Sequence, residues 1–197
     1  GGNGKDGAFS AYVADARKGG PAPKPAIVVI QEIFGVNKVM RDIADNLAEE
    51  GYTAVCPDLF WRIQPGIDIT DQTDAAWDKE FSYFKAFNVD KGVEDIAATI
   101  AWVRGEGHPK VGAVGYCLGG LLAFLTATRT DADAAVGYYG VGIDGNQGVT
   151  GGRNGIMDLR TLLGWDIRTR AGQYTLYFVT VALLFALDCL GSAQAQG

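Results

Sequence analysis

The chain has 197 residues, of which 48% are hydrophobic and 11% aromatic, and this composition predicts one substantial buried core in a single domain or slightly more. The formal net charge of −6 and the lack of a Lys/Arg-rich run argue against nucleic-acid binding. Three cysteines without a C-x-x-C spacing predict neither a disulfide framework nor a zinc site, and they suit a reducing cytoplasm.

The sequence begins with Gly-Gly-Asn-Gly rather than with Met, and no charged segment followed by an apolar run comes after it. We therefore expect no secretory signal and a cytoplasmic location.

Strand and helix patterns alternate along the first 143 residues. Apolar or alternating runs predict strands at 8–13, 26–31, 53–56, 110–115 and 134–139. Apolar residues at helical spacing predict helices at 37–50, 90–104 and 118–128. This alternation predicts an α/β fold with a mostly parallel sheet, helices on both faces, and a ligand site beyond the carboxyl ends of the strands. Three groups of residues come at the ends of predicted strands: 31–34, 57–62 and Cys117. We expect them to converge on one edge of the sheet.

The segment Gly115-Tyr-Cys-Leu-Gly-Gly120 has the small-x-nucleophile-x-small pattern of a nucleophile elbow. A sharp strand-to-helix turn leaves no room for side chains beside the nucleophile, and Gly115 and Gly119 meet that demand. The backbone N–H of Leu118 would lie at a helix N-terminus, where the helix dipole favours a thiolate or a developing oxyanion. The pattern therefore points to acyl transfer through Cys117.

Two other interpretations of this segment stay open. A free cysteine is often simply a buried core residue, and glycine-rich turns also occur in dinucleotide-binding folds. The glycines at 112, 115, 119 and 120 match neither the G-x-G-x-x-G fingerprint nor a phosphate loop, so nucleotide binding is the weaker rival.

Residues 8–143 resemble the dienelactone hydrolase family, the carboxymethylenebutenolidases of the α/β-hydrolase fold. Four segments in the family's order carry the resemblance: 29–37 (VIQEIFGVN), 54–62 (AVCPDLFWR), 111–120 (VGAVGYCLGG) and 135–142 (AVGYYGVG).

The resemblance implies hydrolysis of a small lactone or ester without a cofactor or metal. It implies that Cys117 is the nucleophile, that Glu32 takes its proton, and that the backbone N–H groups of Ile33 and Leu118 bind the oxyanion. Phe34, Arg62 and Tyr116 are the expected substrate contacts, although Arg62 could equally form an ion pair at the surface. In a non-catalytic binding module, Cys117 and Glu32 would only line a pocket.

The sequence departs from the family where the triad's aspartate and histidine should follow on later strands. The only histidine, His108, precedes the elbow strand, and six residues at about 3.3 Å each would place it about 20 Å away, at the opposite edge of the sheet from Cys117. Asp144, Asp158 and Asp166 follow no convincing strand. A cation that the family places before residues 86–87 falls near the uncharged Trp77. We therefore expect impaired turnover and leave the substrate open.

Residues 144–197 have a different character, with a glycine-rich linker followed by the uncharged run Tyr174–Leu187. As a helix this run would extend about 21 Å, short of the roughly 30 Å hydrocarbon core, so a buried helix and a truncated membrane span are both open. Residues 149–187 resemble a fragment of a branched-chain amino acid or urea ABC-transporter permease. We expect a chimera or a frameshift near Asp144, with membrane contact through Tyr174–Leu187 at the inner membrane as the alternative to a cytoplasmic location.

Overall fold

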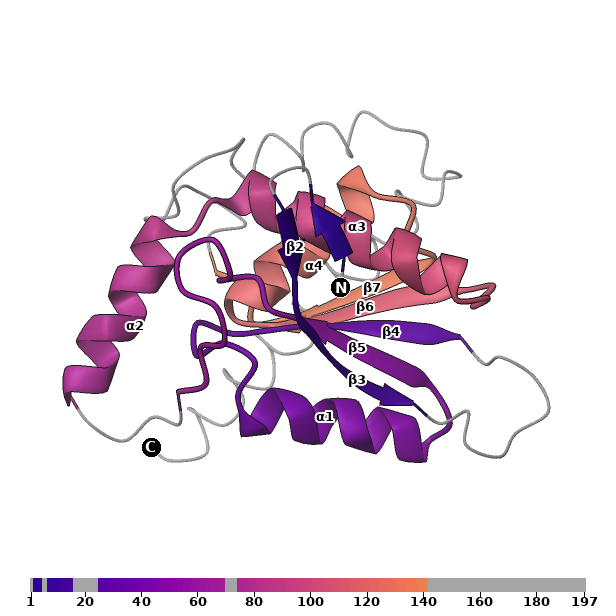
Figure 1. Ribbon diagram of the computed structural model, residues 1–197, viewed down its shortest axis with the longest axis horizontal. Coiled ribbons are helices and arrows are strands. Elements are labelled where there is room, and N and C mark those ends of the chain that lie inside the picture. The colour runs from indigo at the N-terminus through magenta and orange to yellow at the C-terminus, as the bar shows by residue number, and fades with distance from the viewer. Residues whose placement is uncertain (1, 5–6, 16–24, 70–73, 142–197) are drawn as a thin grey trace, which may run out of the picture.

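The computed structural model describes residues 2–4, 7–15, 25–69 and 74–141, with side chains described outside 2–4 and 74–78. At its centre lies a five-stranded sheet of order β3-β5-β4-β6-β7 (Figure 1). Its strands are β3 (Ala11–Asp15), β4 (Ala26–Ile30), β5 (Thr53–Pro57), β6 (Val111–Tyr116) and β7 (Ala134–Tyr138). All neighbouring strands pair in parallel except β3, which is antiparallel to β5. The predicted mostly parallel sheet is confirmed.

The predicted strand at 8–13 is interrupted. The chain forms β2 (Gly7–Phe9), which pairs with β1 (Gly2–Gly4), and then enters β3 after Ser10. The carbonyl of Ser10 accepts a hydrogen bond from the backbone N–H of Asp58 at 2.9 Å, beyond the end of β5. The alternation of apolar residues continues across Ser10, which is why the sequence pattern does not reveal the break.

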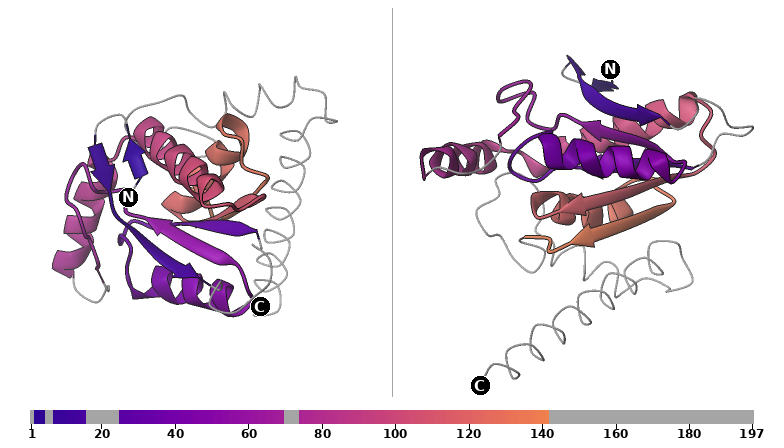
Figure 2. Two further views of the ribbon diagram at one scale, coloured as in Figure 1. Left: turned by 45° about the vertical axis from the view of Figure 1, so that its right-hand side comes forward. Right: turned by 90° about the horizontal axis from the view of Figure 1, so that it is seen from below.

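Helices cover both faces of the sheet (Figures 1 and 2). Helix α1 (Lys38–Glu49) packs on one face, and α3 (Val89–Gly105) and α4 (Leu118–Arg129) pack on the other. Helix α2 (Asp74–Ala86), which the sequence patterns did not predict, lies at the left of Figure 1, beyond the carboxyl ends of the parallel strands. None of the helices in the described ranges is both long and apolar enough to cross a membrane.

The helix starts are fixed by capping side chains. The Asn37 side chain accepts a hydrogen bond from the N–H of Met40, and the Asn88 side chain accepts one from the N–H of Lys91. These bonds satisfy N–H groups that have no partner within the helix. Helix α4 begins differently, because its N-cap residue is Cys117, whose side chain makes no capping bond.

The core has two parts because side chains on a strand alternate between the two faces of the sheet. On β6, Val111 and Ala113 join the larger cluster beneath α3 and α4, whereas Val114 and Tyr116 pack toward α1. The strand is therefore anchored on both sides up to the residue before Cys117.

Candidate active site

Cys117 occupies a sharp turn between β6 and α4, as the elbow pattern predicted. Its φ of 54° and ψ of −114° lie outside the regions that non-glycine residues ordinarily adopt. Its N–H donates to the carbonyl of Tyr138 at 3.1 Å, and its own carbonyl accepts from the N–H of Gly120 at 3.0 Å. Strained backbone of this kind persists only where the surrounding structure holds it, and it concentrates at functional sites.

The two glycines that flank Cys117 are required by close backbone approach. A Cβ on Gly115 would lie closer than 3.0 Å to the backbone of Gly119, and a Cβ on Gly119 would lie that close to the carbonyl oxygens of Ile30 and Gln31. The elbow therefore packs directly on the end of β4, the strand that leads to Glu32.

The Cys117 thiol is half-buried and is protonated at neutral pH. Burial raises its pKa above the ordinary 9.0, a hydrogen bond from the Leu118 N–H lowers it in part, and the negative charge of Glu32 raises it further. Because β4 and β6 pair in parallel, with Ile30 opposite Gly115, the predicted base and the predicted nucleophile follow neighbouring strands at the same edge of the sheet. The side chain of Leu118 is fully buried and that of Ile33 nearly so, and the binding of an oxyanion by their backbone N–H groups stays a prediction.

Tyr139 is a further member of the site that the sequence did not single out. Its hydroxyl donates a hydrogen bond to Oε1 of Glu32 at 3.2 Å. The Tyr139 side chain is 60% exposed, and desolvation of its hydroxyl, followed by the charge and the hydrogen-bond acceptance of Glu32, raises its pKa to about 12. The sequence placed Tyr139 inside the predicted strand at 134–139, whereas the structure ends β7 at Tyr138 and puts Tyr139 just past it.

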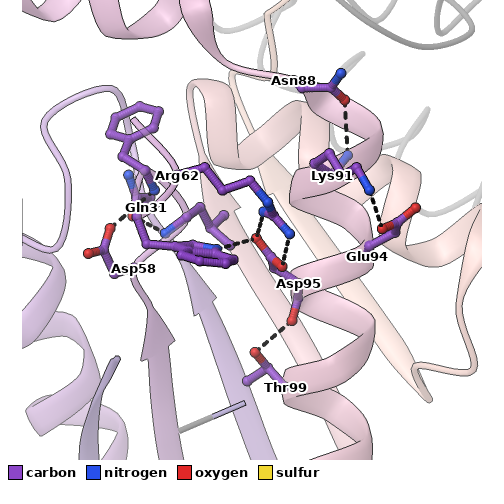
Figure 3. A network of polar contacts seen from close by, with 11 residues as sticks. Gln31, Asp58, Arg62, Asn88, Lys91, Glu94, Asp95 and Thr99 are labelled. Atoms are coloured by element: carbon purple, nitrogen blue, oxygen red, sulfur yellow. Dashed lines mark hydrogen bonds and ion pairs between the residues drawn. The ribbon is translucent and has the colours of Figure 1, made fainter. Parts of the chain in front are cut away.

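Gln31 links the ends of β4 and β5, and its role was also not predicted. Its side chain is fully buried; Oε1 accepts the backbone N–H of Leu59 at 3.0 Å, and Nε2 donates to the carbonyl of Glu32 at 3.4 Å. Figure 3 shows Gln31 beside Asp58 at the carboxyl ends of these strands. An amide at the end of an apolar run was the available signal, because a buried amide needs hydrogen-bond partners.

Arg62 is held in an ion pair rather than presented as a free cation. Its guanidinium donates to both carboxylate oxygens of Asp95, at 2.5 and 3.0 Å, and lies 4.3 Å from the ring centroid of Trp61. The Trp61 indole N–H also donates to Asp95, whose side chain is completely buried on α3 (Figure 3). Of the two roles considered for Arg62, the structure shows the ion pair, although it is part-buried rather than at the open surface. A substrate contact stays a prediction.

The two aromatic residues predicted to contact substrate lie in different surroundings. Tyr116 stacks on Tyr138 with ring centroids 5.0 Å apart, and its centroid is 6.2 Å from that of Tyr139. Phe34 is half-buried and packs against the larger core cluster. Tyr116 is thus placed among the rings that flank the elbow, and its role in binding stays a prediction.

His108 lies where the sequence placed it, in the connection between α3 and β6. It is buried, and the whole length of β6 separates it from Cys117. Asp144, Asp158, Asp166, the Trp77 side chain and the run Tyr174–Leu187 lie outside the described residues. Among the described residues, no group of three His, Cys, Asp or Glu side chains could hold a metal ion.

A pocket of about 290 Å³ is formed by β3, α1 and the loop at 66–68, with Arg41, Asp58 and Asp68 among its lining residues. None of its lining residues belongs to the group around Cys117. The candidate site is therefore the elbow edge and not this pocket.

Comparison with known proteins agrees with this geometry. The model of the dienelactone hydrolase family matches residues 9–151. A candidate carboxymethylenebutenolidase of Azospirillum brasilense is 50% identical over 145 residues, which cover 72% of this chain and 61% of that protein. The carboxymethylenebutenolidase of Pseudomonas putida is 46% identical over 138 residues, which cover 69% of this chain and 57% of the relative.

A solved structure shows the same fold. The crystal structure of a candidate dienelactone hydrolase from Klebsiella pneumoniae superposes with a TM-score of 0.62 at 27% identity, covering 74% of this chain and 60% of that one. The chain thus spans about three fifths of the length of the relatives that it matches. By its sequence, its sheet and its elbow, the chain belongs to the dienelactone hydrolase family and has the α/β-hydrolase fold.

Proposed function

We propose that this chain transfers the acyl group of a small lactone or ester to Cys117. The observation that carries the proposal is the backbone of Cys117, which is held at φ 54° between β6 and α4, while Glu32 follows the neighbouring parallel strand β4 at the same edge of the sheet. A nucleophile and its base within reach of each other on such a turn are the arrangement that covalent acyl transfer needs.

The proposed acylation moves one proton from the Cys117 thiol to Glu32 and transfers the acyl group from oxygen to sulfur. Glu32 accepts the thiol proton as the sulfur attacks the acyl carbon, and the carbonyl electron pair moves onto oxygen. The N–H groups of Ile33 and Leu118 donate to that oxyanion. When the carbonyl re-forms, the C–O bond breaks with its electron pair on the leaving oxygen, which takes a proton from water unless it is a stable phenolate. A thioester remains on Cys117, and a lactone opens its ring at this point.

We propose that release of the acyl group from Cys117 is the slow step of the reaction. Water must be activated to attack the thioester, and the departing Cys117 sulfur must regain a proton, tasks that positioned acid–base groups typically accelerate by about 10²- to 10⁴-fold. The family resemblance assigns these tasks to a histidine on a later strand, whereas His108 lies at the other end of β6. We therefore propose accumulation of the thioester and weak turnover.

A burst experiment tests the proposal. p-Nitrophenyl acetate needs no acid to release its phenolate, so wild-type protein should give a burst of up to one equivalent followed by a slow phase. Cys117→Ala should abolish the burst, and Cys56→Ala should retain it because Cys56 is completely buried beneath α1. A burst of equal size in Cys117→Ala would overturn the assignment of the nucleophile.

Substrate binding is proposed to use Phe34, Tyr116 and Arg62 at the rim of the site. Arg62 would have to share its guanidinium with the buried Asp95, so it would hold a substrate anion only weakly. We accordingly propose a small ester or lactone bound chiefly by aromatic contact.

For residues 144–197 we propose a separate segment that resembles a permease fragment and was joined near Asp144 by a fusion or a frameshift. Membrane contact through Tyr174–Leu187 is a second proposal, favoured by the uncharged run; a cytoplasmic location is the alternative. Partition of the purified chain into the aqueous phase after detergent cloud-point extraction would contradict the membrane proposal. A continuous reading frame through codon 144 without a junction would contradict the fusion.

A further inference from the structure

Tyr139 adopts an unusual backbone conformation directly after β7. Its φ is 40°, in the left-handed region, and Cys117 is the only other described non-glycine residue with a positive φ. A bulky residue rarely adopts this conformation unless its surroundings hold it there. Here the hydroxyl of Tyr139 is bonded to Oε1 of Glu32 at 3.2 Å.

The order of the strands shows which parts of the sheet this hydrogen bond connects. Glu32 follows β4 and Tyr139 follows β7, while β6 runs between these two strands and ends at Cys117. The bond from Tyr139 to Glu32 therefore spans the end of the strand that carries the nucleophile. It joins residues 107 positions apart in the sequence. Among the described residues, it is the side-chain hydrogen bond that the Glu32 carboxylate accepts.

The other titratable groups around the carboxylate are few among the described residues. Cys117 comes from the elbow, Tyr116 from the end of β6 and Tyr138 from the end of β7. Burial, the neighbouring Tyr138 and Glu32 raise the pKa of Tyr116 above 10.0, and that of Tyr139 is about 12. Both shifts disfavour ionisation of the tyrosine hydroxyls.

We propose that Tyr139 is a positioning residue that holds the Glu32 carboxylate beside Cys117. The inference rests on the proposed function, because Glu32 matters here as the partner of Cys117. Without the hydroxyl, the flexible Glu32 side chain would turn toward solvent, and its negative charge would act on the thiol from a greater average distance.

The readout is the pH midpoint of Cys117 alkylation by iodoacetamide, which requires no ester chemistry. Glu32→Gln removes the like charge beside the sulfur, and we expect the midpoint to fall by roughly half a pH unit or more. Tyr139→Phe should lower it in the same direction by a smaller amount. In the Glu32→Gln background, Tyr139→Phe should cause no further shift.

Two controls separate positioning from general loosening of the fold. Tyr138→Phe removes the hydroxyl of a neighbouring exposed tyrosine whose ring packs on Tyr116, and it should leave the midpoint unchanged. Alkylation of the buried Cys56 reports loosening of the fold, which would itself lower the Cys117 midpoint by relieving burial, so a shift in Tyr139→Phe supports positioning only while Cys56 stays protected. If Tyr139→Phe exposes Cys56, the Tyr139→Asn variant replaces it, because asparagine tolerates a positive φ.

Different results would contradict the positioning role of Tyr139 and the role of Glu32 as the base. A shift in Glu32→Gln without one in Tyr139→Phe would overturn the positioning role and leave Glu32 as the base. Equal shifts from Tyr139→Phe in both backgrounds would also overturn it. No shift in Glu32→Gln would show that Glu32 and Cys117 are uncoupled, which contradicts the proposed base and the positioning role together.

Discussion

At the scale of single residues, the environment of a thiol decides what it can do. Cys56 and Cys117 are both reduced in the structure, yet Cys56 is completely buried and Cys117 is half-buried at the elbow. Burial raises the pKa of Cys56 to about 12, and it also raises that of Cys117, where the Leu118 N–H opposes the change. Cys117 is thus the accessible thiol of the pair, but it is not a preformed thiolate.

Alkylation should therefore select Cys117 over Cys56 and should accelerate with pH. Because the folded-state pKa of Cys117 is raised above 9.0, the thiolate is scarce at pH 7, and we expect the rate to keep rising through pH 9. Peptide mapping after iodoacetamide treatment measures both rates. A plateau below pH 8 would contradict the raised pKa, and equal labelling of Cys56 would contradict the reading of Cys117 as an accessible site residue.

At the scale of elements, the site depends on two places where strands and helices meet closely. One is the elbow, where Gly119 touches the end of β4. The other is the network in which Arg62 and Trp61, after β5, bind Asp95 on α3. Both junctions lie at the carboxyl ends of the parallel strands.

Gly119→Ala should destabilise the fold by about 1–3 kcal/mol, because the added methyl group meets two backbone carbonyls that cannot move independently. Gly105→Ala is the matched control, since a Cβ there meets nothing within 4 Å. Urea unfolding of both variants measures the difference. A stability for Gly119→Ala equal to that of Gly105→Ala would show that the elbow is not closely packed.

Arg62→Met should cost about 3–5 kcal/mol, because it leaves the buried Asp95 carboxylate without its cation. Lys38→Met breaks an exposed ion pair with Asp42 and should cost about 1 kcal/mol or less. Adding Asp95→Leu to Arg62→Met should recover stability in chemical denaturation. A double variant no more stable than Arg62→Met would contradict the assignment of the cost to an unpaired charge.

At the scale of the whole molecule, the edge opposite the elbow carries a carboxylate whose pKa is lowered by its partners. Asp133 precedes β7 and accepts bonds from Lys110, from the N–H of Val111 and from Arg104. Burial alone would raise the pKa of this carboxyl, but these bonds outweigh it and lower the pKa to about 2.

Asp133→Asn should therefore lose stability at neutral pH, and the loss should shrink in acid. The folded-state pKa lies below the ordinary 3.8, so the stabilising contribution of the carboxylate is complete above about pH 4 and is lost as the pH falls toward 2. Urea midpoints of both proteins between pH 7 and pH 2 measure the effect. A difference that stays constant down to pH 3 and below would argue against it.

Features set by local chemistry could be predicted from the sequence. The elbow was predictable because Gly115 and Gly119 satisfy a steric demand within a few residues of Cys117, and His108 could be placed because it stands at the start of the same strand. Contacts that depend on strand order could not be predicted. The bond from Tyr139 to Glu32 exists only because β6 lies between β4 and β7, and the Asp95 partner of Arg62 comes from a helix 33 residues away.

The central claim is that Cys117 forms a covalent acyl intermediate with the help of Glu32. Its most direct test is the mass of the protein, and of its Cys117 peptide, after a single turnover with p-nitrophenyl acetate at neutral pH. We predict one acetyl group on Cys117 in the wild type, formation slowed at least about 10²-fold in Glu32→Gln, and none at that position in Cys117→Ala. An unmodified Cys117 peptide in the wild type, or equal rates in the wild type and Glu32→Gln, would contradict the account.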